Sequence, residues 1–157
     1  CHAAGKPVLL DTSGEALRAG VKALPDFIKP NADEVGQLMG AVPNTQQALV
    51  NAALSLHRSG IATVVLSMGA QGALMVCGEG VFWGKPPRIQ AKNTVGCGDS
   101  MVAGFATGMA KGLSAVEQLR LAVAVSAASA LSMTTGSFEP EDLDLLTPGV
   151  EIQQIQQ

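Results

Sequence analysis

The sequence is poor in the residues on which several classes of protein depend. Its 157 residues include three cysteines, one tryptophan and no tyrosine, and 10 basic against 13 acidic side chains leave a formal charge of −3. Three cysteines without metal-ligand spacing argue against a disulfide framework and against a zinc site. Because neither the net charge nor any basic run attracts polyanions, we expect no binding to nucleic acid or to an anionic membrane.

Long hydrophobic runs are missing as well. No 18-residue apolar stretch occurs, and the alanine-rich segment 119–131 is short and contains Arg120. The start of the sequence shows no leader pattern, so the expected location is cytoplasmic. The composition is 47% hydrophobic and only 15% charged, a balance that predicts a folded domain with a packed core.

Short apolar runs bounded by turn residues alternate with segments of helical periodicity. Strands are predicted at 7–10, 27–28, 62–66, 73–77, 81–83, 89–91 and 150–155. Helices are predicted to end near residues 24, 39, 58, 111 and 133, and a short helix is predicted after residue 140. This alternation predicts one α/β layer structure with a mostly parallel sheet.

The most informative segment is 93–105, in which two glycines precede an aspartate at the start of a predicted helix. Gly96 and Gly98 permit a tight turn whose backbone N–H groups converge, and the positive end of the helix dipole adds to them. Such a turn attracts phosphate, and Asp99 in the first helical turn can accept a proton from an attacking hydroxyl group. The combination suits phosphoryl transfer. From spacing alone, an ordinary turn with Asp99 as a helix cap is an equal alternative.

Segment 93–105 resembles the second signature of the PfkB (ribokinase-like) carbohydrate kinase family, with Cys97 where the family usually has alanine. Two further segments match the same family in the same order. Lys29-Pro30-Asn31-Ala32-Asp33-Glu34 is similar to its Lys-Pro-Asn-x-x-Glu element, and Ser67-Met68-Gly69-Ala70-Gln71-Gly72 resembles its nucleotide-binding turn. Taken singly, the first has the spacing of a capping box and the second can be a plain strand-ending turn. Their joint occurrence in family order favours the family.

The resemblance covers nearly the whole chain and implies a ribokinase-like three-layer α/β/α fold. It implies that residues 1–157 form the C-terminal, nucleotide-binding and catalytic part of one such domain. The N-terminal sugar-binding half and its lid would then lie outside the sequence. On this interpretation the parent protein is expected to be a homodimer, and the isolated chain is expected to self-associate and to be inactive or impaired as an enzyme.

The resemblance further implies ATP-dependent phosphoryl transfer to a hydroxyl group of a hexose phosphate. The motifs favour conversion of fructose 1-phosphate to fructose 1,6-bisphosphate. Tagatose 6-phosphate or fructose 6-phosphate as the acceptor stays open, and so does a truncated, non-catalytic nucleotide-binding or interaction module. The expected cofactors are ATP with Mg²⁺ and, in addition, K⁺.

The resemblance also assigns roles to single residues. Asp99 is the expected catalytic base, and the anion hole is expected to consist of the backbone N–H groups of Gly96, Cys97, Gly98 and Asp99. The residues expected to bind the nucleotide are Lys29, Asn31, Glu34, Ser67, Gly69, Gln71, Gly72, Met101, Val123, Ser126 and Ala127. Asn31 and Glu34 are expected to organise Mg²⁺ through water. Backbone at Asn93, Val95, Thr134 and Gly136 is expected to hold the monovalent cation.

Aromatic residues make up only 3% of the chain, so adenine is expected to lie between aliphatic walls rather than against a ring. Val123 and Ala127, taken individually, are better explained as helix core.

Overall fold

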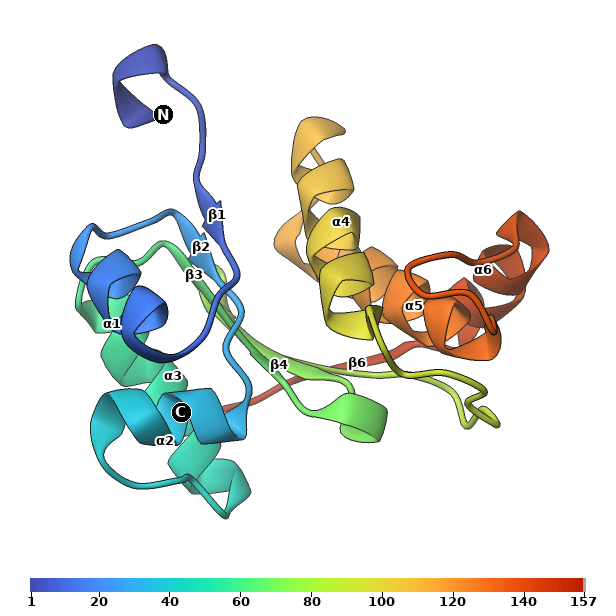
Figure 1. The fold of residues 1–157 in the computed structure, drawn as a ribbon, viewed down its shortest axis with the longest axis horizontal. Coiled ribbons are helices and arrows are strands. Elements are labelled where there is room, and N and C mark those ends of the chain that lie inside the picture. Colours follow the sequence, from blue (N-terminus) through green and yellow to red (C-terminus); the bar gives the residue numbers. More distant parts are fainter. Residues whose placement is uncertain (157) are drawn as a thin grey trace. The chain divides into compact units, whose positions relative to one another are not determined.

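The computed structural model describes residues 1–156, which form two compact units (Figure 1). The first unit consists of residues 1–68, 74–81 and 155–156, and the second consists of residues 69–73 and 82–154. The chain therefore alternates between the units where its central strands lie. Each unit is described separately below.

Six strands hydrogen-bond in the order in which they occur in the chain. They are β1 (Leu9–Leu10), β2 (Phe27–Ile28), β3 (Thr63–Ser67), β4 (Ala73–Cys77), β5 (Gly80–Lys85) and β6 (Glu151–Gln154). The first three are parallel, with Leu9 opposite Phe27 and Phe27 opposite Thr63. β5 and β6 are antiparallel, with Phe82 opposite Gln154. The sheet is thus parallel where β1, β2 and β3 meet and antiparallel at its β6 edge.

In the first unit, three helices accompany the parallel strands: α1 (Gly14–Lys22), α2 (Ala32–Met39) and α3 (Gln46–Arg58). α2 begins with a capping box between Asn31 and Glu34, and the Thr45 side chain accepts a hydrogen bond at the start of α3. α3 packs on β3. Both residues of β2 are fully buried, as the apolar character of a central parallel strand requires.

In the second unit, α4 (Cys97–Ala110) packs along α5 (Ala115–Leu131), and α6 (Pro140–Leu146) packs on α5. α5 starts with a capping box in which Ser114 and Glu117 exchange hydrogen bonds. Two glycines on α4 allow the close approach of α5. A β-carbon at Gly104 would lie 2.6 Å from the Ala122 α-carbon, and one at Gly108 would lie 2.8 Å from the Gln118 γ-carbon.

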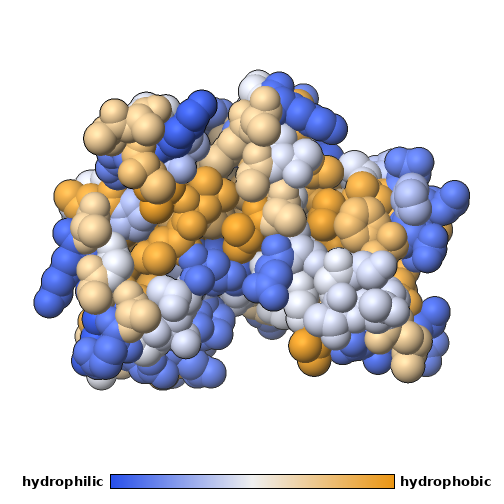
Figure 2. Space-filling model, turned by 45° about the horizontal axis from the view of Figure 1, so that its top comes forward, coloured by the Kyte–Doolittle hydropathy of each residue, from blue (hydrophilic) through white to orange (hydrophobic). Residues whose placement is uncertain are grey.

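Three short 3₁₀ turns complete the chain, at His2–Ala4, Gly69–Gln71 and Thr147–Gly149. Within residues 1–156, no helix combines the length and the apolar character needed to cross a bilayer. Six large apolar side chains remain exposed: Leu24, Met39, Val42, Val95, Met133 and Leu145. Figure 2 shows hydrophobic side chains gathered among hydrophilic ones on one face of the molecule.

The structure moves several of the predicted element bounds and lacks one predicted strand. α1 ends at Lys22, and Leu24, just before Pro25, adopts a left-handed backbone with φ 51°. α5 ends at Leu131 rather than at residue 133. Residues 89–91 form no strand, and Ile89 packs against a buried cluster of α5 and α6 that contains Ala127 and Leu146.

The contact of α4 with α5 predicts that Gly104→Ala destabilises the chain. At an open helix position this change would stabilise by about 1 kcal/mol through helix propensity. Here the added methyl group meets backbone atoms of Ala122, so we expect a loss of about 1–3 kcal/mol of unfolding free energy from overpacking. Urea unfolding measures the change. Gly78→Ala is the matched control, because no atom lies within 4 Å of its added β-carbon. Equal stability of the two variants would contradict the prediction.

Candidate functional site

In the first unit, the carboxyl ends of the parallel strands carry a group of polar residues. Asp11 follows β1, Lys29 follows β2, and Asn31 forms an isolated parallel bridge with Ser67 at the end of β3. The Ser67 N–H also donates to the Pro30 carbonyl at 3.1 Å. This edge is where open parallel α/β sheets commonly bind ligands.

Lys29 is the buried cation of this group. Its side chain is only 7% exposed, and its Nζ lies 3.3 Å from Oδ2 of Asp11, whose side chain is 27% exposed. A charge removed from water needs a partner of opposite sign. Asp11 supplies that partner and thereby aims the ammonium group at the end of the sheet.

Asn31 and Glu34 cap α2 reciprocally. The Glu34 N–H donates to Asn31 Oδ1 at 2.9 Å, and the Asn31 N–H donates to Glu34 Oε2 at 2.8 Å. Within residues 1–156, no three or more His, Cys, Asp or Glu side chains gather as a metal site. A Mg²⁺ ion that these two residues helped to organise would therefore take most of its ligands from water and phosphate, which is the usual coordination of Mg²⁺ beside nucleotides.

In the second unit, the glycine loop leads directly into α4. Gly96 is the residue before the helix and has a left-handed backbone with φ 84°. A β-carbon there would lie 2.8 Å from Thr135 Cγ2 and 3.0 Å from the Gly136 nitrogen, so only glycine fits this turn. Because Gly96 has no side chain, it cannot cap the first N–H groups of α4, which an α-helix leaves without partners inside the helix.

The four predicted anion-hole residues are not equivalent. The Cys97 N–H donates to the Thr94 carbonyl at 3.3 Å, and the Gly96 carbonyl accepts from the Ser100 N–H at 2.9 Å. Gly98 and Asp99 occupy the second and third positions of α4, where N–H groups point out of the helix end. Asp99 is exposed in that first turn. The helix end thus offers N–H donors to an anion and a carboxylate that can accept a proton.

Asn93 connects the two segments predicted to hold a monovalent cation. Its side-chain amide donates to the Met133 carbonyl and to Thr135 Oγ1, each at 3.3 Å, and its Oδ1 accepts from the Val95 N–H at 3.0 Å. The Asn93 side chain is therefore occupied in holding backbone in place. Any cation bound here would be held by backbone carbonyl groups of this loop and of residues 134–136.

Cys97 occupies the loop position where the family usually has alanine. Its Sγ donates a weak hydrogen bond to the Asn93 carbonyl at 3.7 Å. Burial raises the pKa of the Cys97 thiol above its ordinary value, and the Ser129 hydroxyl offsets part of that rise.

Of the predicted nucleotide turn, residues 67–72, the part 69–72 belongs to the second unit and packs on β5. Its 3₁₀ turn closes with a hydrogen bond from the Gly72 N–H to the Gly69 carbonyl at 3.0 Å. A β-carbon on Gly72, which has φ 86°, would lie 1.9 Å from the Gly84 carbonyl oxygen. The indole N–H of Trp83 donates to the Gln71 carbonyl at 2.9 Å. The ring N–H of Trp83 thus holds a residue of this loop, and the aliphatic adenine site stays a prediction.

The predicted nucleotide-binding residues on α4 and α5 differ in their exposure to solvent. Met101 and Val123 are 4% and 1% exposed, and Ala127 belongs to the buried cluster of α5 and α6. Val123 faces β5, where a β-carbon on Gly84 would lie 3.1 Å from Val123 Cγ2. Ser126 is half-buried. Packing thus accounts for Met101, Val123 and Ala127, and Ser126 retains surface for a ligand.

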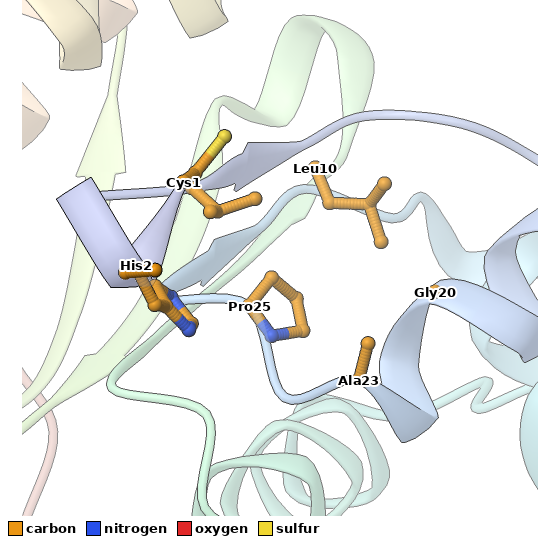
Figure 3. Close-up of a pocket in the computed structure, with 8 residues that line it drawn as sticks. Cys1, His2, Leu10, Gly20, Ala23 and Pro25 are labelled. Carbon is orange, nitrogen blue, oxygen red and sulfur yellow. The ribbon is translucent and has the colours of Figure 1, made fainter. Parts of the chain in front are cut away.

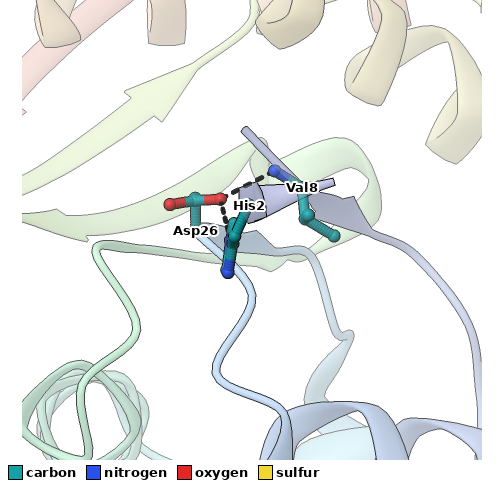
Figure 4. A network of polar contacts seen from close by, with 3 residues as sticks. All are labelled: His2, Val8 and Asp26. Carbon is teal, nitrogen blue, oxygen red and sulfur yellow. Dashed lines mark hydrogen bonds and ion pairs between the residues drawn. The ribbon is translucent and has the colours of Figure 1, made fainter. Parts of the chain in front are cut away.

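A groove of about 400 Å³ opens in the first unit, but it contains none of the predicted site residues. Mostly apolar groups line it, from the first residues of the chain, β1 and the end of α1 (Figure 3). At the same end of the unit, Asp26 Oδ2 accepts from the Val8 N–H and contacts His2 Nε2, each at 2.7 Å (Figure 4). The Val8 N–H and, to a lesser extent, the His2 side chain hold the pKa of Asp26 below its ordinary value.

The contact of Asp11 with Lys29 and that of Trp83 with Gln71 were not predicted from the sequence. The signal for Asp11 was its place directly after a parallel strand, where functional side chains collect. No local signal identified Trp83, because its partner lies 12 residues away across a turn.

Comparison with known proteins gives consistent results. The profile of the pfkB family of carbohydrate kinases matches residues 1–142. The 1-phosphofructokinase of Haemophilus influenzae is 43% identical over 155 residues, which covers 98% of this chain and 49% of that protein. Phosphofructokinase-2 of Escherichia coli, solved in complex with potassium, superposes with a TM-score of 0.86 and 32% identity over 91% of this chain and 47% of its own.

The ribokinase of Arabidopsis thaliana, solved with ribose and ATP, superposes with a TM-score of 0.79 and 25% identity, covering 92% of this chain and 48% of its own. These neighbours share a ribokinase-like mixed α/β fold with this chain. The chain spans about half the length of the relatives that it matches.

The Lys29–Asp11 pair predicts that Asp11→Asn destabilises the first unit. The substitution leaves a buried ammonium group without its charge partner, so we expect a loss of about 1–3 kcal/mol in urea unfolding. Glu15→Gln is the control. The Glu15 carboxylate is 89% exposed and lies 3.5 Å from Arg18, and such surface pairs contribute at most about 1 kcal/mol. If Asp11→Asn were as stable as Glu15→Gln, Asp11 would not be the partner that burial of Lys29 requires.

The raised pKa of Cys97 predicts its alkylation profile. Only the thiolate reacts with iodoacetamide, and burial disfavours the thiolate. The pH midpoint for alkylation of Cys97 in the folded chain should therefore lie above that of Cys97 in the chain unfolded in guanidinium, which should lie at about 8.5. Peptide mass spectrometry resolves Cys97 from the other cysteines. A folded-state midpoint at or below the unfolded one would contradict the prediction.

Proposed function

The chain belongs to the pfkB family of carbohydrate kinases, and on that premise we propose that it is the catalytic part of a kinase that phosphorylates a hexose phosphate at the expense of ATP. The observation that carries this proposal is the start of α4, where Gly96 leaves the helix end uncapped and Asp99 stands in the first turn. A helix end of this kind stabilises negative charge, and phosphoryl transfer needs such stabilisation beside a proton acceptor.

In the proposed reaction, Asp99 takes the proton from the attacking hydroxyl group of the sugar. The hydroxyl oxygen forms a bond with the γ-phosphorus of ATP, the bond from that phosphorus to the β–γ bridging oxygen breaks, and ADP leaves. The N–H groups of Gly98 and Asp99 face the charge that develops on the transferred phosphoryl group. The Cys97 N–H joins them if its 3.3 Å bond to Thr94 opens.

The first unit would contribute to nucleotide binding through the ends of its parallel strands. Lys29, held by Asp11, places a positive charge where the phosphates of a nucleotide require one. Asn31 and Glu34 would help to hold Mg²⁺, which neutralises phosphate charge when bound. Ser67 would supply a hydroxyl group at the end of β3. In the second unit, Gly69, Gln71 and Gly72 would supply backbone.

Two further ligands fit the second unit. Backbone at Asn93, Val95, Thr134 and Gly136 would hold a monovalent cation, and the potassium complex of the Escherichia coli relative supports this assignment. Ser126 on α5 would face the adenine side.

The acceptor we propose is fructose 1-phosphate, with fructose 1,6-bisphosphate as the product. Support comes from the 1-phosphofructokinase of Haemophilus influenzae, whose identity of 43% exceeds the 32% of phosphofructokinase-2. Because the chain spans half the length of these relatives, we further propose that it is the C-terminal part of the domain. The sugar contacts would come from a complementary half, and a longer parent protein would form a homodimer in the cytoplasm.

The proposal predicts that Asp99→Asn abolishes turnover and spares nucleotide binding. In a full-length polypeptide that contains this chain, loss of the proton acceptor should lower kcat about 10²- to 10⁴-fold. The Kd for Mg-ATP, measured by calorimetry on the 157-residue chain, should stay within about threefold. A coupled assay with fructose 1-phosphate, tagatose 6-phosphate and fructose 6-phosphate identifies the acceptor.

Asp142→Asn is the control for this experiment, because Asp142 also lies in the first turn of a helix, α6. It should leave kcat unchanged. Full turnover by Asp99→Asn would exclude Asp99 as the base. Mg-ATP binding with no turnover on any acceptor in the full-length polypeptide would favour the non-catalytic module.

A further inference from the structure

The backbone of the turn at residues 69–72 has one face packed and one face open. Gly72 is buried against β5, where its α-carbon faces the Gly84 carbonyl and Pro86 Cδ too closely for any β-carbon. Gly69, Ala70 and Gln71 are exposed. Contacts with β5 therefore use one side of the turn, and a ligand can meet only the other side.

Trp83 holds the exposed end of this turn. Its indole N–H donates to the Gln71 carbonyl at 2.9 Å, and its side chain is buried, with 8% of the residue exposed. Gln71 is exposed, whereas Gly72, the next residue, is buried against β5. The turn is thus held to β5 at two residues: Gly72 by packing and Gln71 by the hydrogen bond from Trp83.

Lys85 adds a second contact to the same ring. Residues 83 and 85 point to one side of β5, because alternate residues of a strand share a face. The Lys85 Nζ lies 5.6 Å from the centroid of the Trp83 ring, within the range of a cation–π interaction. The ring face is therefore occupied by an ammonium group while the ring N–H is occupied by the turn, and the indole has a restricted orientation.

We propose that Trp83 is a positioning residue for nucleotide binding, and that its indole reports occupancy of the 69–72 turn. This inference rests on the proposed function, because it gives the turn a nucleotide as its ligand. Trp83 acts by fixing the Gln71 carbonyl and with it the exposed side of the turn, so that less conformational freedom is lost when the ligand binds.

The test uses the 157-residue chain and the variants Trp83→Phe and Phe82→Leu. Trp83→Phe keeps an aromatic ring and removes the N–H donor. Phe82→Leu is the control, because Phe82 is equally buried on the opposite side of β5. Calorimetry with Mg-ATP should show a Kd about fivefold higher for Trp83→Phe, which corresponds to about 1 kcal/mol, and an unchanged Kd for Phe82→Leu.

Two further measurements separate positioning from general stability. Amide hydrogen exchange without nucleotide should be faster at residues 69–72 in Trp83→Phe and unchanged there in Phe82→Leu, since exchange reports local opening. Trp83 is the only tryptophan in the chain, so its fluorescence emission should shift as Mg-ATP saturates the chain. Lys85→Met should alter the starting emission and leave the exchange of the turn unchanged.

Each outcome bears on a distinct statement. Unchanged exchange at residues 69–72 in Trp83→Phe would overturn the positioning role whatever happens with ATP. A wild-type Kd in Trp83→Phe, or constant emission at a Mg-ATP concentration that calorimetry shows to be saturating, would overturn the link to the nucleotide. Faster exchange in Trp83→Phe, together with no Mg-ATP binding by the unmodified chain, would overturn the nucleotide role of Trp83, and turnover by the full-length polypeptide decides separately whether the proposed function holds.

Discussion

The left-handed backbone of Gly96 determines what the start of α4 can do. Its φ of 84° and its contacts with Thr135 and Gly136 leave no room for a β-carbon, so no side chain is available there to cap the helix. For this reason no side chain at the start of α4 caps the N–H groups of Gly98 and Asp99. The same contact brings residues 134–136 against the glycine loop, where Asn93 bonds both segments. Phosphate binding, proton acceptance and cation binding would all depend on this one turn.

The first unit works under a different constraint, the burial of a cation. Lys29 follows a strand whose two residues are fully buried, and its own side chain is 7% exposed. Such a group is stable only beside a negative charge, and the parallel pairing of β1 with β2 places Asp11 beside it. The ion pair is therefore a consequence of the sheet. In an ATP-dependent sugar kinase, this ion pair would also keep a positive charge directed at phosphate without a flexible surface side chain.

In each unit, packing or capping contacts fix one side of the candidate binding segments. The turn at residues 69–72 is packed on β5, α2 is capped by the residues that would organise Mg²⁺, and the glycine loop is wedged by residues 135–136. The packing contacts of each segment lie on the side that faces the protein, and the opposite side is polar and accessible. This arrangement suits a family in which positioning and electrostatic stabilisation supply most of the catalysis. The chain carries these elements while spanning about half the length of its relatives.

Local patterns in the sequence determined most of the elements. Apolar periodicity, capping residues and glycines act within a few positions of one another. They predict the strands β2 and β4, the ends of α2 and α3, and the glycine loop before α4. Three features were decided by tertiary structure alone. Trp83 meets Gln71, Lys29 meets Asp11, and Asn93 meets Thr135 across 12, 18 and 42 positions. No local pattern records which distant groups meet, because strand order and helix packing bring them together. For the same reason, Ile89 packs on α5 and α6 instead of forming the predicted strand. Met101 and Val123, which were predicted to bind the nucleotide, are buried in the core.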